Sequence, residues 1–284
     1  MNLIEHAKMP ALLPSLARVI LLPRKGVKPK DQLPVIVCRA KHVKVNQLIL
    51  DQYCNLAGIT DSDELPPLFP HALAGPLHMD MLGHEIFPMK LLGATHKYNS
   101  IEVFGKLPRN GEYMIEVKLG KTHYHQKGIE FEMETLLYLD DKLVWKGVST
   151  QLKSMKFREL PLDDRGPFIS PAECHKEIDN WKIPFYAGKV YALLCKDFNP
   201  IHISYALAKV FGFQRDLAHG FFVAARACNT MKSSDLIGKK WKVYFKGPSY
   251  MGKHLTLLQS NDERQRWDIR AKGNDRPIIA LEIE

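Results

Sequence analysis

The sequence lacks the cysteine spacings that build disulfide frameworks and zinc sites. It has five cysteines, an odd number, and no two of them form a CxxC pair. A small secreted scaffold would show an even set, and a structural zinc site would show paired CxxC motifs. We therefore predict free thiols in a reducing compartment and a cytoplasmic location. The cysteines are Cys38, Cys54, Cys174, Cys195 and Cys228.

Long apolar runs are also missing. Residues 11–22 are apolar but are interrupted by Pro14 and Arg18, and the stretch is too short to span a bilayer. It also lacks the cleavage signature of a secretory signal peptide. We therefore predict no membrane partner. Eighteen glycines and eighteen prolines are near average use for 284 residues, which excludes collagen-like and low-complexity chains.

No run of five like charges occurs, although 40 lysines and arginines against 31 aspartates and glutamates give a formal net charge of +9. Such a surplus attracts anionic partners over long range. The densest basic segment, residues 24–30, is typical of a linker, and no basic-aromatic signature of a nucleic-acid surface is present. We predict no nucleic-acid partner. An acidic carrier protein or a phosphorylated small ligand remains compatible with the charge.

The sequence contains the same order of elements twice. In each half a helix rich in small and apolar residues, expected at 71–82 and at 220–231, precedes strands in which polar and apolar residues alternate. The expected strands cover residues 100–104, 113–119, 129–135 and 143–148, then 241–246, 254–259, 266–271 and 278–284. We infer a duplicated α+β unit in which one long helix lies on a curved antiparallel sheet.

Three segments are expected along the chain. Residues 1–32 form an N-terminal helix and a basic linker, residues 33–160 the first α+β unit, and residues 161–284 the second. The turn-rich, charged stretch at 158–171 marks the boundary between the two units. Before the first long helix, a strand is expected at 34–38 and a helix at 47–57 that stops at Gly58.

The sharpest local signal is the hexapeptide Asp-Phe-Asn-Pro-Ile-His at residues 197–202. Asn199 followed by Pro200 predicts a helix start, because asparagine caps the first amides and proline suits the first helical position. His202 then lies in the first turn, and the break before the helix can fold Asp197 back toward it. Such a pair could hold a water molecule between them. A capped turn without chemistry would also account for these residues.

A second signal lies about sixteen residues later, at Ala218-His219-Gly220, where the apolar helix is expected to begin. Glycine lets a backbone approach a ligand closely, and a free amide at a helix start can stabilise an oxyanion. A packing or turn glycine would also account for Gly220.

Together, Asp197-x-Asn-Pro-x-His202 and Ala218-His-Gly220 resemble the signature of the MaoC-like (hydratase 2) family, which comprises (R)-specific enoyl-CoA hydratases and 3-hydroxyacyl-thioester dehydratases. The resemblance covers residues 185–260. It implies an α+β hot-dog fold, a long helix wrapped by an antiparallel sheet. Because the first half carries no such motif, the resemblance implies a double hot-dog chain with a degenerate N-terminal unit and one active site in the C-terminal unit.

The resemblance implies a hydro-lyase that reversibly hydrates 2-enoyl thioesters and dehydrates (3R)-hydroxyacyl thioesters in fatty-acid metabolism. Asp197 and His202 match the catalytic pair, and Gly220 matches the residue whose amide faces the thioester carbonyl. The positions expected to shape the turn or to contact substrate are Asn199, Pro200, His219 and Phe221.

The expected substrates are acyl-CoA or acyl carrier protein thioesters, so coenzyme A or phosphopantetheine enters as part of the substrate. No metal and no redox cofactor are expected. Since the two halves can pair within one chain, the expected assembly is a monomeric pseudo-dimer or a homodimer.

Lys196 departs from the family pattern, in which glycine commonly precedes the catalytic aspartate. This departure favours an alternative in which the chain binds acyl thioesters without turning them over. A hot-dog thioesterase is a second alternative, and the aspartate before Asn-Pro-x-His speaks against it. Cys195 is expected to be a small core residue, because no base lies at a suitable spacing.

The remaining histidines lack this sequence context. His123 and His125 alternate on an expected strand and could share a metal ion, but no further ligand follows at a useful spacing, so we expect a solvated strand edge. His71, His78 and His84, on or near the first long helix, are expected to be structural.

Overall fold

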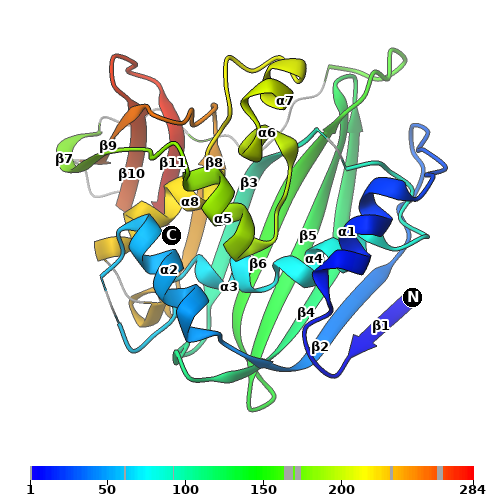
Figure 1. The fold of residues 1–284 in the computed structure, drawn as a ribbon, viewed down its shortest axis with the longest axis horizontal. Helices are drawn as coiled ribbons and strands as arrows, with labels where there is room; N and C mark the ends of the chain where they lie inside the picture. Colours follow the sequence, from blue (N-terminus) through cyan, green and yellow to red (C-terminus); the bar gives the residue numbers. More distant parts are fainter. Residues whose placement is uncertain are drawn as a thin grey trace.

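One curved sheet runs through the structure, a computed structural model that describes residues 2–60, 62–91, 93–162, 169, 174–230, 233–260 and 265–284. Among these residues eleven strands form the sheet (Figure 1). The first half contributes β1 (Asn2–His6), β2 (Ile36–Lys44), β3 (Ala94–Val103), β4 (Glu112–His125), β5 (Gly128–Leu139) and β6 (Lys142–Ser154). The second half contributes β7 (Cys174–Lys182), β8 (Lys240–Phe245), β9 (His254–Ser260), β10 (Gln265–Ala271) and β11 (Pro277–Ile283).

The strand order repeats about a central seam. It reads β1-β2-β4-β5-β6-β3 and then β8-β11-β10-β9-β7, so each unit has its first strand outermost and its second strand at the seam, apart from the added β1. At the seam β3 and β8 pair antiparallel from Tyr98↔Tyr244 to Glu102↔Lys240. This repeated order confirms the duplicated α+β unit. Strand β1, where only a helix and linker were expected, pairs in parallel with β2.

The helices gather on one face of the sheet (Figure 1). They are α1 (Leu12–Leu21), α2 (Gln47–Ala57), α3 (Phe69–Leu73), α4 (Gly75–Gly83), α5 (Ala187–Cys195), α6 (Pro200–Ile203), α7 (Tyr205–Val210) and α8 (Gly220–Ala225), with 3-10 turns η1 (Arg226–Thr230) and η2 (Ser233–Leu236). In the described part of the chain, no helix has the length and apolar character needed to cross a membrane. The expected stop at Gly58 is confirmed, because this residue ends α2 with a left-handed backbone at φ 66°.

The long central helices expected in each half are shorter than the sequence suggests. In the first half the helix is divided into α3 and α4 at Ala74. Pro76, which follows the break, has no amide to donate back to the preceding turn. In the second half α8 lasts six residues and tightens into η1 at Arg226, whose guanidinium is held by Asp179 of β7. The segment 158–171 expected to separate the units lies partly outside the described residues, and the domain limits stay a prediction.

Helix α1 is fastened to α4 by a buried carboxylate. Asp80 accepts hydrogen bonds from the Ser15 hydroxyl at 2.9 Å, from His6 Nε2 at 2.9 Å and from the Arg18 guanidinium. Arg24 then donates to backbone carbonyls at the end of α4 and beyond, including those of His84 and Phe87. These polar contacts hold α1 over the concave side of the first unit.

Gly75, the first residue of α4, lies against the end of α5 in the other unit. A Cβ placed on Gly75 would collide with the backbone carbonyl oxygen of Cys195. A backbone carbonyl at the end of a packed helix cannot rotate away as a flexible side chain can. The two units therefore approach each other as closely as they do only because residue 75 has no side chain.

We predict that Gly75→Ala lowers the free energy of unfolding by about 1–3 kcal/mol, the usual cost of forcing an extra methyl group into a packed core. Urea denaturation measures this change. Gly247→Ala is the matched control, because its new Cβ would meet Ile278 at an ordinary 3.6 Å. Equal stabilities for the two variants would contradict the close-packed contact.

Candidate active site

The site begins at a sharp turn after α5. Lys196 adopts a left-handed backbone, with φ 62° and ψ 21°, and reverses the chain direction. Its ammonium group donates to the carbonyl of Leu193 at 2.6 Å, which satisfies one of the last acceptors of the helix. The conformation is one that glycine adopts without cost, so lysine takes up the backbone geometry that glycine would have at this position.

The next residues fold Asp197 back onto the chain that follows it. The Asn199 amide donates to Asp197 Oδ1 at 3.0 Å, and Asn199 Oδ1 caps α6 by accepting from the Ile201 amide at 3.5 Å. Pro200 is the first residue of α6, as its fixed φ favours. His202 consequently lies in the first turn of α6, as the sequence predicts.

A second segment, residues 217–219, is tied to this turn by hydrogen bonds. The Leu217 amide donates to the Ile201 carbonyl at 3.0 Å, and His219 Nε2 donates to the Asp197 backbone carbonyl at 3.1 Å. The Ala218 amide donates to the Ser249 carbonyl at 2.7 Å. These bonds place His219, the N-cap residue of α8, directly beside His202.

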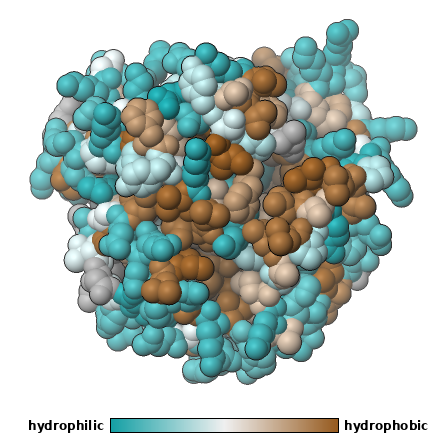
Figure 2. All heavy atoms as spheres, viewed as in Figure 1, coloured by the Kyte–Doolittle hydropathy of each residue, from teal (hydrophilic) through white to brown (hydrophobic). Residues whose placement is uncertain are grey.

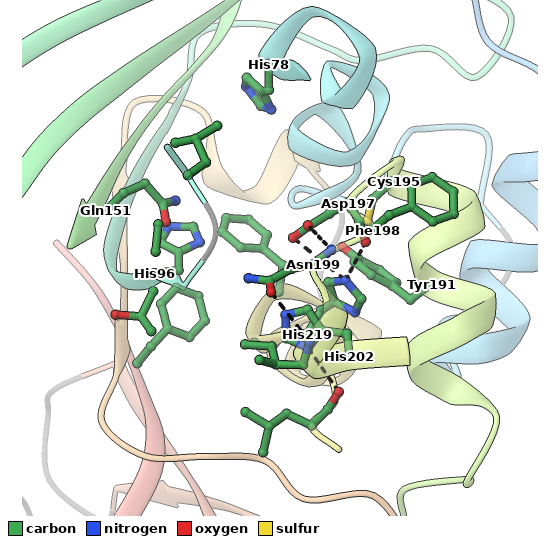
Figure 3. Close-up of a pocket in the computed structure, with 18 of the residues that line it drawn as sticks. His78, His96, Gln151, Tyr191, Cys195, Asp197, Phe198, Asn199, His202 and His219 are labelled. Carbon is green, nitrogen blue, oxygen red and sulfur yellow. Dashed lines mark hydrogen bonds and ion pairs between the residues drawn. The ribbon is translucent and has the colours of Figure 1, made fainter. Parts of the chain in front are cut away.

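Three chemically active side chains converge at this point (Figure 3). One carboxylate oxygen of Asp197, one ring nitrogen of His202 and one ring nitrogen of His219 all lie within 4.8 Å of one another. The two imidazole rings are stacked, with centroids 3.7 Å apart and planes inclined by 26°. His202 Nδ1 donates to the Leu217 carbonyl at 3.0 Å, so in the neutral ring Nε2 carries the lone pair.

Burial keeps both imidazoles neutral. It lowers the pKa of His202, and the Asp197 carboxylate opposes this shift. The pKa of His219 is lowered further, first by burial and then by the neighbouring His202 ring. A neutral His202 with a bare Nε2 can accept a proton from a water molecule, and the half-exposed Asp197 carboxylate can orient that water.

The same three residues are, by donor type, those that could hold a metal ion. Their geometry fits acid–base chemistry better. Stacked rings direct their in-plane lone pairs along nearly parallel planes, whereas metal ligands must point at one centre. In addition, His219 Nδ1 is sealed in the protein and has no hydrogen-bond partner among the described residues.

The converging side chains open onto a cavity of about 750 Å³ whose walls come from both units. Gly220 and Phe221 line it, and the Gly220 amide is the first of α8, where no intrahelical acceptor exists. A Cβ on Gly220 would lie 2.6 Å from the Phe245 ring, so this position requires glycine. Phe221 stacks on His71 of α3, with centroids 4.2 Å apart and planes 12° from parallel.

The far wall of the cavity is the part that sequence reasoning missed. His71 and His78, expected to be structural, line the cavity, and His96 and Gln151 join them (Figure 3). His96 and Gln151 are register partners on β3 and β6, and no local pattern marks either one. His84 does not line the cavity, and its Nδ1 accepts from the Ile86 amide at 3.4 Å.

Two further expectations have a clear outcome. Cys195 is buried, as expected of a core residue, and burial raises the pKa of its thiol well above the usual range, so it stays protonated. The solvated edge expected for His125 is wrong, because its side chain is fully buried and lies 3.4 Å from Glu130. Its partner in the expected pair, His123, is exposed.

We predict that Lys196→Gly changes the free energy of unfolding by less than about 1 kcal/mol. Relief of the left-handed backbone contributes about 1 kcal/mol, and the greater flexibility of glycine in the unfolded chain offsets a similar amount. Urea denaturation of the two proteins provides the comparison. A loss well beyond this range would mean that the contact between Lys196 and Leu193, rather than the backbone angle, holds the turn.

The buried histidines also predict how stability depends on pH. Burial lowers the pKa of His78 to about 4, so the unfolded chain takes up a proton near pH 6.5 while the folded chain does not. Stability is therefore present above pH 6.5 and is lost as pH falls from there toward 4. His78→Gln should reduce the slope of unfolding free energy by about 1.4 kcal/mol per pH unit in this window. Urea denaturation of the wild type and the variant at several pH values measures this slope, and an equal slope for the two proteins would contradict the prediction.

The chain is similar to proteins of known family. Residues 188–276 match the MaoC like domain family. The chain is 25% identical over 222 residues to 3-hydroxyacyl-thioester dehydratase X of Mycobacterium tuberculosis, covering 77% of this chain and 78% of that protein. It is 28% identical over 95 residues to the (R)-specific enoyl-CoA hydratase of Aeromonas caviae, covering 32% and 65%.

Among solved structures, HtdX of Mycobacterium tuberculosis superimposes with a TM-score of 0.74 at 20% identity, covering 87% of this chain and 98% of that one. Rv0216 of Mycobacterium tuberculosis, which is described as having a double hotdog fold, superimposes with a TM-score of 0.53 at 10% identity, covering 92% of this chain and 96% of that one. The fold is the α+β double hot-dog that the sequence predicts.

Proposed function

Because the chain carries a MaoC-like domain in a double hot-dog fold, we propose that it is a hydro-lyase acting on acyl thioesters. It adds water to 2-enoyl thioesters and, in reverse, removes water from (3R)-hydroxyacyl thioesters, in fatty-acid metabolism. The names of the two curated relatives, a 3-hydroxyacyl-thioester dehydratase and an (R)-specific enoyl-CoA hydratase, support this reaction.

The observation that carries the proposal is the pairing of Asp197 with a neutral His202. The Leu217 carbonyl holds the Nδ1 proton of His202, so Nε2 is the basic atom. An Asp197 carboxylate oxygen lies within 4.8 Å of a ring nitrogen of His202. Together they orient a water molecule and accept its proton, and the proton they hold belongs to the pair.

Hydration then follows with all atoms accounted for. The water oxygen bonds to the β-carbon of the enoyl thioester while one of its protons passes to the Asp197–His202 pair. The π electrons move onto the thioester oxygen. As the carbonyl re-forms, the Asp197–His202 pair delivers a proton to the α-carbon and returns to its starting protonation state. No oxidation state changes at any protein group, so the reaction draws on no redox cofactor. Dehydration is the same sequence in reverse.

Gly220 is positioned to stabilise the enolate-like oxygen. Gly220 lines the cavity beside Asp197 and His202, and its amide, the first of α8, has no acceptor within the helix. A single amide donor of this kind is worth about 3 kcal/mol in transition-state stabilisation. We propose that the thioester carbonyl lies against this amide and that His219 and Phe221, on either side in the sequence, contact the acyl group.

The cavity also supports a substrate with an acyl chain of some length. Its walls include α1, α4 and β5 of the first unit, which lacks the acid–base residues. We propose that the acyl chain extends into this half. The net charge of +9 suits the phosphates of coenzyme A or an acidic acyl carrier protein.

The alternative of a binding module without turnover drew its support from Lys196. That support is weakened, because Lys196 already adopts the left-handed backbone that glycine would take.

We further propose that one chain is a self-sufficient pseudo-dimer, since β3 and β8 join the two units within it. Four buried free cysteines, Cys38, Cys54, Cys195 and Cys228, are compatible with the cytoplasm.

We predict that Asp197→Asn and His202→Gln each lower kcat/KM for hydration about 10²- to 10⁴-fold, the usual contribution of a positioned acid or base. Loss of enoyl absorbance with crotonyl-CoA and with 2-octenoyl-CoA measures the rate. His254→Gln, at an exposed site away from the cavity, is the matched histidine control and should keep the wild-type rate.

Circular dichroism shows whether the variants fold. Wild-type rates that survive both substitutions would refute the assignment of the pair, and tight binding of 2-enoyl-CoA without loss of absorbance would favour the binding module.

A further inference from the structure

The wall opposite the proposed acid–base pair combines uncharged polar side chains with many apolar ones. Figure 3 shows His78, His96 and Gln151 facing the turn that carries Asp197, Asn199 and His202. Much of the remaining lining is apolar, and it includes Leu16, Val19, Met79, Leu82, Phe131 and Met133. Two lysines also line the cavity: Lys97 is paired with Glu130, and Lys90 is exposed. An apolar lining alone would suit an unsubstituted alkyl chain, whereas buried polar groups require hydrogen-bond partners.

Two of the wall residues have no such partner. His78 Nε2 is hydrogen-bonded to the Thr135 hydroxyl at 2.8 Å, and His96 Nε2 to the Tyr98 carbonyl at 3.1 Å. Within the described ranges, no hydrogen-bond partner is found for His71 or Gln151. The unpaired polar atoms of the His71 and Gln151 side chains are not sealed inside the protein. Because both residues line the cavity, these atoms open onto it.

The histidines of this wall are neutral. Burial lowers the pKa of His71 well below its ordinary value, and it lowers the pKa of His96 to about 3. Each neutral ring presents one N–H donor and one lone pair. The Gln151 amide likewise offers both a donor and an acceptor. Such a set recognises an uncharged oxygen function, a hydroxyl or a carbonyl, rather than a second anion.

The wall adjoins the reacting end of the cavity. His71 and His96 both stack on Phe221, with ring centroids 4.2 Å and 5.1 Å away, and Phe221 follows Gly220 directly. An acyl chain that leaves the Gly220 amide and enters the first unit therefore passes these groups. A plain alkyl chain would displace water from His71 and Gln151 without replacing its hydrogen bonds, at a cost of roughly tenfold or more in affinity for each group.

We propose that the preferred acyl group carries a hydroxyl or carbonyl oxygen beyond the reacting carbons, and that this oxygen is hydrogen-bonded by His71 and Gln151. The inference rests on the proposed function, since it takes the occupant of the cavity to be an acyl thioester. It narrows the expected substrates from fatty acyl thioesters in general to those whose acyl chain carries an additional oxygen. His71 and Gln151 then act as specificity residues.

Binding of saturated thioesters tests the proposal without any need for turnover. Calorimetry would compare octanoyl-CoA with its 5-, 6-, 7- and 8-hydroxy derivatives, none of which can be hydrated. We expect at least one hydroxylated chain to bind the wild-type protein tenfold or more tightly than octanoyl-CoA. His71→Phe, which keeps the stack on Phe221, and Gln151→Met should each bring that ratio close to one. Met79→Leu, an apolar exchange on the same wall, is the control and should keep the ratio.

Two results would overturn the proposal. In one, octanoyl-CoA binds wild type most tightly of the panel. In the other, His71→Phe and Gln151→Met weaken all the thioesters equally, which would mean that the wall contacts the carrier arm or only supports the fold. Failure of the proposed function has a different signature. If the hydroxylated chain binds selectively while no 2-enoyl thioester is hydrated, the wall assignment stands and the hydro-lyase assignment falls.

Discussion

The pairing of β3 with β8 is the constraint on which the rest of the molecule depends. It joins two sheets into one, and the helices of both units lie on the same face of that sheet (Figure 1). The cavity can then be walled by both units, with the proposed acid–base residues from the second and polar side chains from the first. The contact of Gly75 with the Cys195 carbonyl closes the remaining distance, because it brings α4 against the end of α5. Separation of the units would leave neither with a complete site.

The proposed chemistry depends on a few hydrogen bonds to and from backbone groups. The Leu217 carbonyl accepts from His202, and the Leu217 amide donates to the Ile201 carbonyl beside it. The loop that orients the imidazole is thus attached to the same helix that carries it. His219 adds a second attachment, from its ring to the Asp197 carbonyl. In the proposed reaction, side chains held by backbone groups in this way would need little reorganisation, and such preorganisation is the main source of electrostatic catalysis.

The sequence reveals the second unit's site far better than the first unit's wall, and the reason is physical. Asp197 and His202 are five residues apart, and local turn chemistry at Asn199 and Pro200 brings them together. The wall depends on register instead. His96 meets Gln151 only because β3 and β6 pair as they do, over a sequence separation that no local pattern reveals. The predicted helix lengths were wrong for a related reason. The apolar pattern in the sequence continues through both the break at Ala74 and the 3-10 turn that begins at Arg226.

Burial gives the two sides of the cavity complementary roles. The same exclusion of water that lowers the pKa of His202 and leaves it a base also lowers the pKa of His78 and His96. On one side a neutral ring accepts a proton beside a half-exposed carboxylate. On the other, neutral rings can only exchange hydrogen bonds. Protonation of the wall would place cations against apolar side chains such as Phe131 and Met133, a costly arrangement in a buried site. The wall is therefore suited to recognition, and we propose that proton transfer belongs to Asp197 and His202.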